Sequence, residues 1–109
     1  MKREVITNNC IEGFHCYPQA KGNIGYLSAR HRHIFEIRCW AKVTHNEREI
    51  EINTEQNRIE SAFNKAFGAP CEFGDMSCES IAEWLLGEFP EMSKVQVLED
   101  GYGGAALTR

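Results

Sequence analysis

Three of the four histidines in this chain, His15, His31 and His33, are candidate ligands for a metal ion. His31 and His33 are separated by one residue in the stretch "ARHRHIFEIRCW", just before a run of alternating apolar residues. Residues i and i+2 of a β-strand point to the same side, so these two imidazoles can share one ligand. If the segment that ends near His15 pairs with this strand as a hairpin, a third imidazole comes beside them. Three imidazoles with a fourth position left open form a zinc site of the catalytic type.

The same histidines also have a simpler interpretation. Two histidines at the start of a strand can be surface or half-buried residues that make ordinary packing contacts and hydrogen bonds. The remaining histidine, His45, lies in the polar stretch "THNERE", where an exposed surface role is expected. Metal binding therefore depends on whether the fold brings His15 to the other two histidines.

Length and composition describe one ordinary globular domain over residues 1–109. The chain has 42% hydrophobic and 26% charged residues, and its formal net charge of −4 argues against a nucleic-acid partner, which normally needs a basic face. No apolar run approaches the ~20 residues that span a bilayer, and "MKREVITNNC" lacks the apolar region of a signal peptide. The five cysteines have no CxxC spacing, which argues against a disulfide framework or a four-cysteine zinc site. Reduced thiols in a cytoplasm are expected.

Hydrophobic periodicity predicts four strands and two helices. The expected strands cover residues 4–17, 31–43, 93–100 and 102–109, the last two joined by a turn at Asp100-Gly101. The expected helices begin at caps formed by Asn53 or Thr54 and by Ser77, and they end at Gly68 and before Pro90. The order β-β-α-α-β-β favours an α+β fold, with an antiparallel four-stranded sheet and two helices on one face.

Four segments resemble the 6-pyruvoyltetrahydropterin synthase / 6-carboxytetrahydropterin synthase family, which has the T-fold. "GFHCYPQA" resembles the end of the family's first strand, and "HRHIFEI" resembles its H-G-H-aromatic motif. "SCESIAEWL" resembles its helix-opening T-S-E-N motif, and "KVQVLED" resembles its terminal strand. The segments occur in the family's order and are spread over nearly the whole chain, which therefore looks like a short, divergent, T-fold-like member.

This resemblance implies zinc as the cofactor and an oligomer as the assembly. His15, His31 and His33 match the family's zinc ligands. The family's sheets close into a barrel, which implies a homo-oligomer, possibly a hexamer. Such closure would protect the two edges of a four-stranded sheet, which are prone to aggregation when they stay open.

The resemblance also implies a site for a pterin ring. Glu99 matches the glutamate that pairs with the guanidine-like edge of the pterin, an edge that a carboxylate suits because it accepts two parallel N–H bonds. Ser77 and Cys78 lie where family members grip the same ring with a helix N-terminus. In the alternative interpretation, Glu99 is a solvated residue at a strand end beside a turn. Ser77 is then simply a helix cap, a role that does not exclude ligand binding.

The acid–base residues of the family are missing. Leu27 occupies the position of the catalytic cysteine, Arg32 replaces the glycine between the paired histidines, and "NKAFGAPCEFGDMS" contains no Asp-His pair. Cys16 is adjacent to His15, but strand neighbours face opposite ways, so its thiol is a poor substitute.

Two functions of different class follow from this pattern. The first is a zinc-binding, 6-pyruvoyltetrahydropterin synthase-like protein that acts on a pterin or a related purine-like ligand, with altered or lost carbon–oxygen lyase chemistry. The second is a non-catalytic T-fold protein that binds a ligand or serves as an oligomeric structural component. A small domain without any metal is the third alternative.

Overall fold

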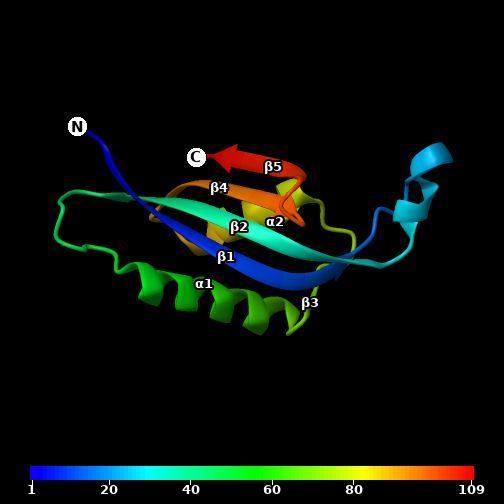
Figure 1. Cartoon of the computed structure of the whole chain (residues 1–109), viewed down its shortest axis with the longest axis horizontal. Helices are drawn as coiled ribbons and strands as arrows, with labels where there is room; N and C mark the ends of the chain where they lie inside the picture. The colour runs from blue at the N-terminus through cyan, green and yellow to red at the C-terminus, as the bar shows by residue number, and fades with distance from the viewer.

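The computed structural model describes all 109 residues and has a mixed α+β fold (Figure 1). In chain order the elements are β1 (Arg3–His15), the 3-10 helix η1 (Gly22–Ser28), β2 (His31–Val43), α1 (Ile52–Phe67), β3 (Cys71–Glu72), α2 (Cys78–Glu88), β4 (Met92–Glu99) and β5 (Gly103–Thr108). The predicted α+β class is confirmed, and the four predicted strands and two predicted helices occur in the expected order.

The sheet differs from the prediction in size and in one strand direction. Its five strands are ordered β3-β1-β2-β4-β5, so the predicted four-stranded, wholly antiparallel sheet is wrong. The additional strand β3 runs parallel to β1, with Cys71 opposite Gly13 and Glu72 opposite Phe14. Two residues are too few to produce a hydrophobic period, so the sequence carried no signal for this strand.

The helices begin as their caps dictate, and one cap was predicted wrongly. The α1 helix is capped by Glu51, whose carboxylate accepts hydrogen bonds from the backbone N–H groups of Asn53 and Thr54 at 2.8 and 3.0 Å. A carboxylate is suited to this position because the first N–H groups of a helix have no partner within it. The α2 helix begins after Ser77, as predicted, and the Ser77 hydroxyl accepts from the Ser80 N–H at 3.1 Å. None of the helices has the length and apolar character needed to cross a membrane.

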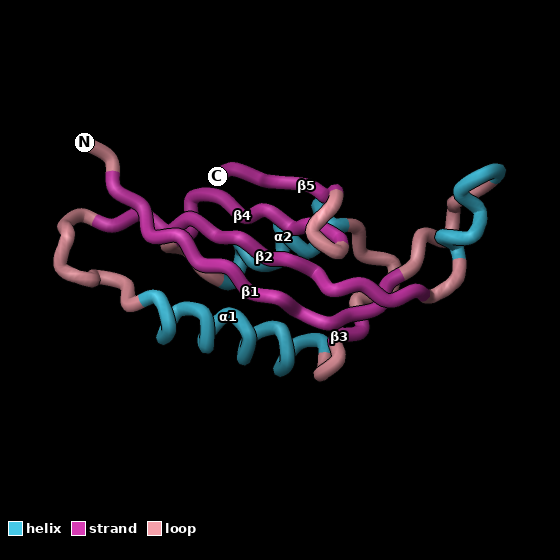
Figure 2. Tube along the Cα trace, in the orientation of Figure 1, coloured by secondary structure: helices cyan, strands magenta, loops and turns pink.

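Both α-helices cover the same face of the sheet. Figure 2 shows α1 alongside β1 and α2 behind β4 and β5, in agreement with the contacts between these elements. The alternate residues of the strands that face the helices are buried and form one core with the helices, including Phe35, Ile37, Val95 and Val97 of the sheet and Ile59, Phe63, Ile81 and Leu85 of the helices. The other face of the sheet has no helix over it, so its side chains remain partly or fully exposed.

Strand register at one end of the sheet brings histidines and a glutamate together. In the antiparallel β1–β2 pair, His15 lies opposite His31 and Gly13 lies opposite His33. In the β2–β4 pair, Glu99 lies opposite Phe35, two residues beyond His33. Because residues two apart share a face, these side chains meet on the helix-covered side of the sheet.

Candidate metal centre

The structure brings the three predicted histidines into one cluster. His15 is the last residue of β1 and His31 is the first residue of β2, and their ring centroids lie 4.6 Å apart. The ring of His33 lies 4.9 Å from that of His31 and 5.2 Å from that of His15. The hairpin geometry inferred from the sequence therefore holds for the positions of all three rings.

A carboxylate from the end of β4 joins the histidines. The Oε2 atom of Glu99 lies 2.8 Å from Nε2 of His15 and 3.4 Å from Nε2 of His33. With His31 included, the ligand atoms of all four side chains lie within 4.8 Å of one another. The sequence predicted a ring-binding role for Glu99, and the structure places its carboxylate against the imidazoles.

Contacts on the far side of each ring determine which nitrogen faces the cluster. The Nδ1 atom of His15 lies 2.9 Å from the Met76 carbonyl oxygen, and that of His31 lies 2.9 Å from the Ala29 carbonyl oxygen. A carbonyl oxygen can only accept, so these two Nδ1 atoms carry the hydrogen in the neutral rings. The Nε2 atoms are then left with lone pairs directed into the cluster. Metal-binding histidines typically have such an outer partner.

The third ring has a carboxylate as its outer partner. Nδ1 of His33 lies 2.6 Å from Oδ2 of Asp100, the residue that follows Glu99. This hydrogen bond, together with one from the Ile34 N–H, lowers the pKa of Asp100 below its ordinary value. The sequence indicated only a turn at Asp100, because nothing local shows that the turn lies beside His33.

The electrostatics of the cluster favour a cation. His15 is buried, with 8% of its surface exposed, and its Nε2 atom has no hydrogen-bond partner. The Glu99 carboxylate oxygen lies 2.8 Å from it and also offers a lone pair when it is ionised. Two lone pairs facing each other in a buried position are unfavourable unless a proton or a metal ion lies between them. The group of His15, His31, His33 and Glu99 can therefore hold a metal ion.

Buried aromatic side chains pack against the histidine rings. The fully buried Phe35 ring lies edge-on to His15 and His33, with centroid distances of 5.1 and 5.5 Å. Phe73 in turn packs edge-on against Phe35, with a centroid distance of 5.1 Å. Packing of this kind restricts the rotamers of the imidazoles and excludes water from one side of the cluster.

A cavity of about 450 Å³ opens beside the cluster. Its lining includes His15, His31, Glu99, Ser77 and Cys78, five of the six site residues predicted from the sequence. Only His33 does not line it. The β1–β2 connection and the start of α2 thus border the same space as the metal-ligand candidates.

The two residues at the start of α2 have defined chemical states. The Ser77 hydroxyl caps the helix and contacts the Ser80 hydroxyl at 3.1 Å. Cys78 is buried, and burial, followed by the charges of Glu99 and Glu79, raises the pKa of its thiol to about 12. Cys78 therefore stays a protonated thiol near neutral pH and is no candidate for a base.

Cys16 lies closer to the site than strand alternation suggested. The strand ends at His15, and the Cys16 N–H donates to the Gly74 carbonyl at 2.8 Å instead of continuing the β1–β2 ladder. Alternation between opposite faces applies only within a strand, so the sequence argument that turned Cys16 away does not hold. Half-buried Cys16 and Leu27 both line the cavity.

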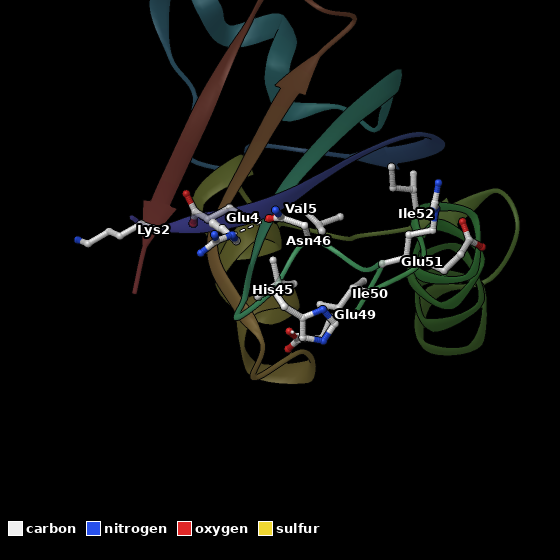
Figure 3. A pocket seen from close by; sticks show the side chains of 12 residues that line it. Lys2, Glu4, Val5, His45, Asn46, Glu49, Ile50, Glu51 and Ile52 are labelled. Carbon is white, nitrogen blue, oxygen red and sulfur yellow. Dashed lines mark hydrogen bonds and ion pairs between the residues drawn. The ribbon is translucent and has the colours of Figure 1, made fainter.

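A second cavity, of about 500 Å³, lies at the opposite end of the hairpin and contains the fourth histidine (Figure 3). There, Nδ1 of His45 accepts from the Glu47 N–H at 3.1 Å, and Nε2 lies 3.5 Å from the Glu49 carboxylate. His45 is exposed, as predicted. Its nitrogens are engaged by neighbours in the same loop, so this cavity has no cluster of free ligand atoms.

Comparison with known proteins adds no identification. No model of a known protein family matches the sequence, and no curated protein matches it. The function of the chain is therefore inferred from the geometry and the donor chemistry of the histidine cluster.

Proposed function

We propose that this chain is a zinc-binding protein with a T-fold-like architecture that binds a pterin or a related purine-like ligand beside the metal. The observation that carries the proposal is the convergence of one ring nitrogen from each of three imidazoles and one carboxylate oxygen within 4.8 Å. Zinc suits this donor set better than magnesium or calcium, which prefer oxygen ligands. The resemblance of four sequence segments to the 6-pyruvoyltetrahydropterin synthase family supports the choice of ligand class.

The ligand would bind in the cavity that adjoins the cluster. Its volume of about 450 Å³ lies within the range of roughly 300–1,000 Å³ that is usual for small-molecule sites. The Glu99 carboxylate borders this space and could accept two N–H bonds from the guanidine-like edge of a bicyclic ring. Zinc, held by His15, His31 and His33, would polarise an oxygen of the ligand.

Carbon–oxygen lyase chemistry needs a base, and the cavity offers few candidates. Leu27 cannot carry a proton, and the thiol of Cys78 remains protonated near neutral pH because of its raised pKa. Cys16 is the remaining thiol in the lining. Loss of a positioned base typically lowers the rate by about 10²–10⁴-fold, so we expect weak or absent turnover of dihydroneopterin triphosphate.

A second candidate function is a structural zinc site, and the position of Glu99 favours it. Three histidines and a carboxylate would complete tetrahedral coordination, whereas catalytic zinc keeps one position for water or substrate. The Glu99 carboxylate oxygen lies 2.8 Å from Nε2 of His15, close enough to supply a fourth ligand. In this case the zinc would join the ends of β1, β2 and β4 without a ligand.

Metal analysis tests both versions. We expect elemental analysis of the purified protein to find one zinc ion per chain, released as the pH falls through the range in which histidine titrates, because the ligands must be deprotonated. Purified protein that neither contains zinc nor takes it up after treatment with a chelator would exclude both functions. Robust turnover of dihydroneopterin triphosphate would show that the cavity contains an effective base.

The variant Glu99→Ala separates the two functions. If Glu99 binds the ligand ring, the variant keeps its zinc and loses pterin binding, measured by quenching of pterin fluorescence. If Glu99 closes the coordination, the variant loses most of its zinc affinity. Glu79→Ala, another carboxylate in the cavity lining, is the control and should change neither measurement strongly.

We also propose that the chain forms a homo-oligomer through its sheet edges. No strand lies beyond β5, so its outward peptide groups are open to pairing, and the helix-free face exposes Ile6 to 51%. Edges and faces of this kind are usually covered. Sedimentation should give a species larger than a monomer at micromolar concentration, and a stable, folded monomer would contradict the proposal.

A further inference from the structure

We propose that Asp100 is a positioning residue that selects the metal-binding tautomer of His33. This inference rests on the proposed zinc site, but the control of the His33 tautomer by Asp100 can be tested in the metal-free protein. Asp100 is outside the group of four candidate ligands, and no motif in the sequence marks it for this role. Its side chain instead contacts the outer nitrogen of the His33 ring, 2.6 Å away.

Asp100 extends the β2–β4 hydrogen-bond ladder with its side chain as well as its backbone. The ladder ends with the pair Phe35–Glu99, and the next pair in register would be Ile34 and Asp100. The Asp100 N–H donates to the Ile34 carbonyl at 2.8 Å, and the Ile34 N–H donates to Oδ1 of Asp100 at 2.8 Å. The side-chain oxygen therefore takes the place of a backbone carbonyl in the ladder.

The backbone of Asp100 explains this replacement. Its φ is +56°, in the left-handed region that few residues other than glycine, asparagine and aspartate adopt readily. The chain turns away from β2 at this residue, so the Ile34 N–H is bonded by the Asp100 side chain and not by a backbone carbonyl of the next strand. One oxygen of the carboxylate thus holds the sheet, and the other is left to accept from His33.

The second oxygen decides where the proton of His33 lies. An ionised carboxylate can only accept hydrogen bonds, so Nδ1 of a neutral His33 must donate. The lone pair is then on Nε2, which faces Glu99 at 3.4 Å and the proposed zinc position. The opposite tautomer would place a hydrogen on the nitrogen that must bind the metal.

Asp100→Asn tests this role with minimal change in shape. The amide oxygen of asparagine can still accept from the Ile34 N–H, and asparagine tolerates the left-handed backbone. The amide nitrogen would then face Nδ1 of His33 and donate to it, which favours the tautomer with hydrogen on Nε2. A change in outer partner of this kind typically lowers metal affinity by about 10–100-fold.

Three measurements on wild type and variant form the experiment. Long-range ¹H–¹⁵N correlations of the metal-free proteins, at a pH where His33 is neutral, should show hydrogen on Nδ1 in wild type and on Nε2 in Asp100→Asn. Competition titration with a zinc chelator should show the loss of zinc affinity, while the midpoint of urea unfolding of the metal-free proteins stays the same. The tautomer is a readout that a merely structural role would not move.

Glu12→Gln is the matched control. Glu12 lies opposite Ile34 on β1, but its carboxylate pairs with Arg32 at 2.6 Å on the helix-free side of the sheet. This variant removes the same charge at the same level of the hairpin, so we expect its zinc affinity to stay within about threefold of wild type and the tautomer of His33 to be unchanged.

The outcomes separate this inference from the proposed function. Hydrogen on Nε2 of His33 in the wild-type protein, or Asp100→Asn with an unchanged tautomer and unchanged zinc affinity, would overturn the role of Asp100. If the tautomer changes as expected while the wild-type protein binds no zinc, the proposed zinc site fails and the control of His33 by Asp100 stands.

Discussion

Carboxylates meet nitrogen-bearing side chains at both ends of the β1–β2 hairpin, but only one end contains a permanent cation. At the open end, Arg58 donates to the carboxylate of Glu55 and lies 3.2 Å from that of Glu91. At the closed end, Glu99 faces the Nε2 atoms of His15 and His33. A guanidinium is always protonated, whereas these imidazoles direct their Nδ1 atoms outward and present lone pairs inward.

The charge balance explains why only the closed-end cluster is a candidate metal site. The open-end cluster contains a permanent cation, Arg58, which contacts both of its carboxylates. The closed-end cluster contains no permanent cation, so a proton or a metal ion must offset the charge of the Glu99 carboxylate. Carboxylates beside nitrogen-bearing side chains therefore differ in chemistry between the two ends. A guanidinium only donates hydrogen bonds, whereas a neutral imidazole also offers a lone pair that can bind a metal ion.

The largest effect should come from removing a ligand at the closed end. We expect His31→Ala to lower zinc affinity by more than the roughly 10–100-fold that loss of an outer partner costs, because a donor atom itself is lost. Chelator competition measures the change. His45→Ala, at the open end, should keep its zinc, because both nitrogens of His45 contact its own loop. Full zinc retention by His31→Ala would show that the closed-end cluster is not the metal site.

A backbone change at the closed end should have the next largest effect. A Cβ at Gly13 would lie 2.6 Å from the Phe73 ring, which is buried among other aromatic rings. Gly13→Ala should therefore lower the free energy of unfolding by about 1–3 kcal/mol and weaken zinc binding, because Gly13 pairs with His33. Urea denaturation measures the stability.

Gly87→Ala is the control for this substitution. A Cβ at Gly87 meets nothing within 4 Å, and the residue lies inside α2. Alanine should raise the free energy of unfolding by roughly 0.5–1 kcal/mol, since glycine is unfavourable within a helix. Equal losses of stability in both variants would contradict the packing explanation.

The smallest effect should come from the carboxylates at the open end. Burial, followed by the hydrogen bond and charge of Glu91, raises the pKa of Glu55, which is only 2% exposed. The folded protein thus binds this proton more tightly than the unfolded chain. The stability from this group is complete below the ordinary glutamate pKa and declines as the pH rises through the raised value.

Glu55→Gln should therefore gain stability relative to wild type between about pH 4 and pH 7, because glutamine does not titrate in that range. Urea denaturation at both pH values measures this difference. A relative gain for wild type over the same interval would show that the charge of Arg58 outweighs burial and Glu91 in setting the pKa of Glu55.

Local sequence patterns were enough to predict four of the five strands, both α-helices and the proximity of the three histidines. Alternation over residues 31–43 predicted β2, and the 3.6-residue period around Ile59 and Phe63 predicted α1, because these patterns come from local backbone geometry. The antiparallel pairing of the consecutive strands β1 and β2, joined through residues 16–30, brings His15 opposite His31. A hairpin is local in sequence, so this part of the candidate site could be predicted.

The contacts of the carboxylates and of Cys16 in the site depend on tertiary structure. Glu99 and Asp100 reach the histidines through the register of β4 against β2, a pairing between segments about sixty residues apart. The two-residue strand β3 and the place of Cys16 in the cavity likewise depend on packing beyond the end of β1. Such contacts are selected by how the helices and strands fill a common core, and no local pattern records that choice. The sequence could therefore name three ligand candidates, while the fold determined that Glu99 faces His15 and His33 and that Asp100 contacts the outer nitrogen of His33.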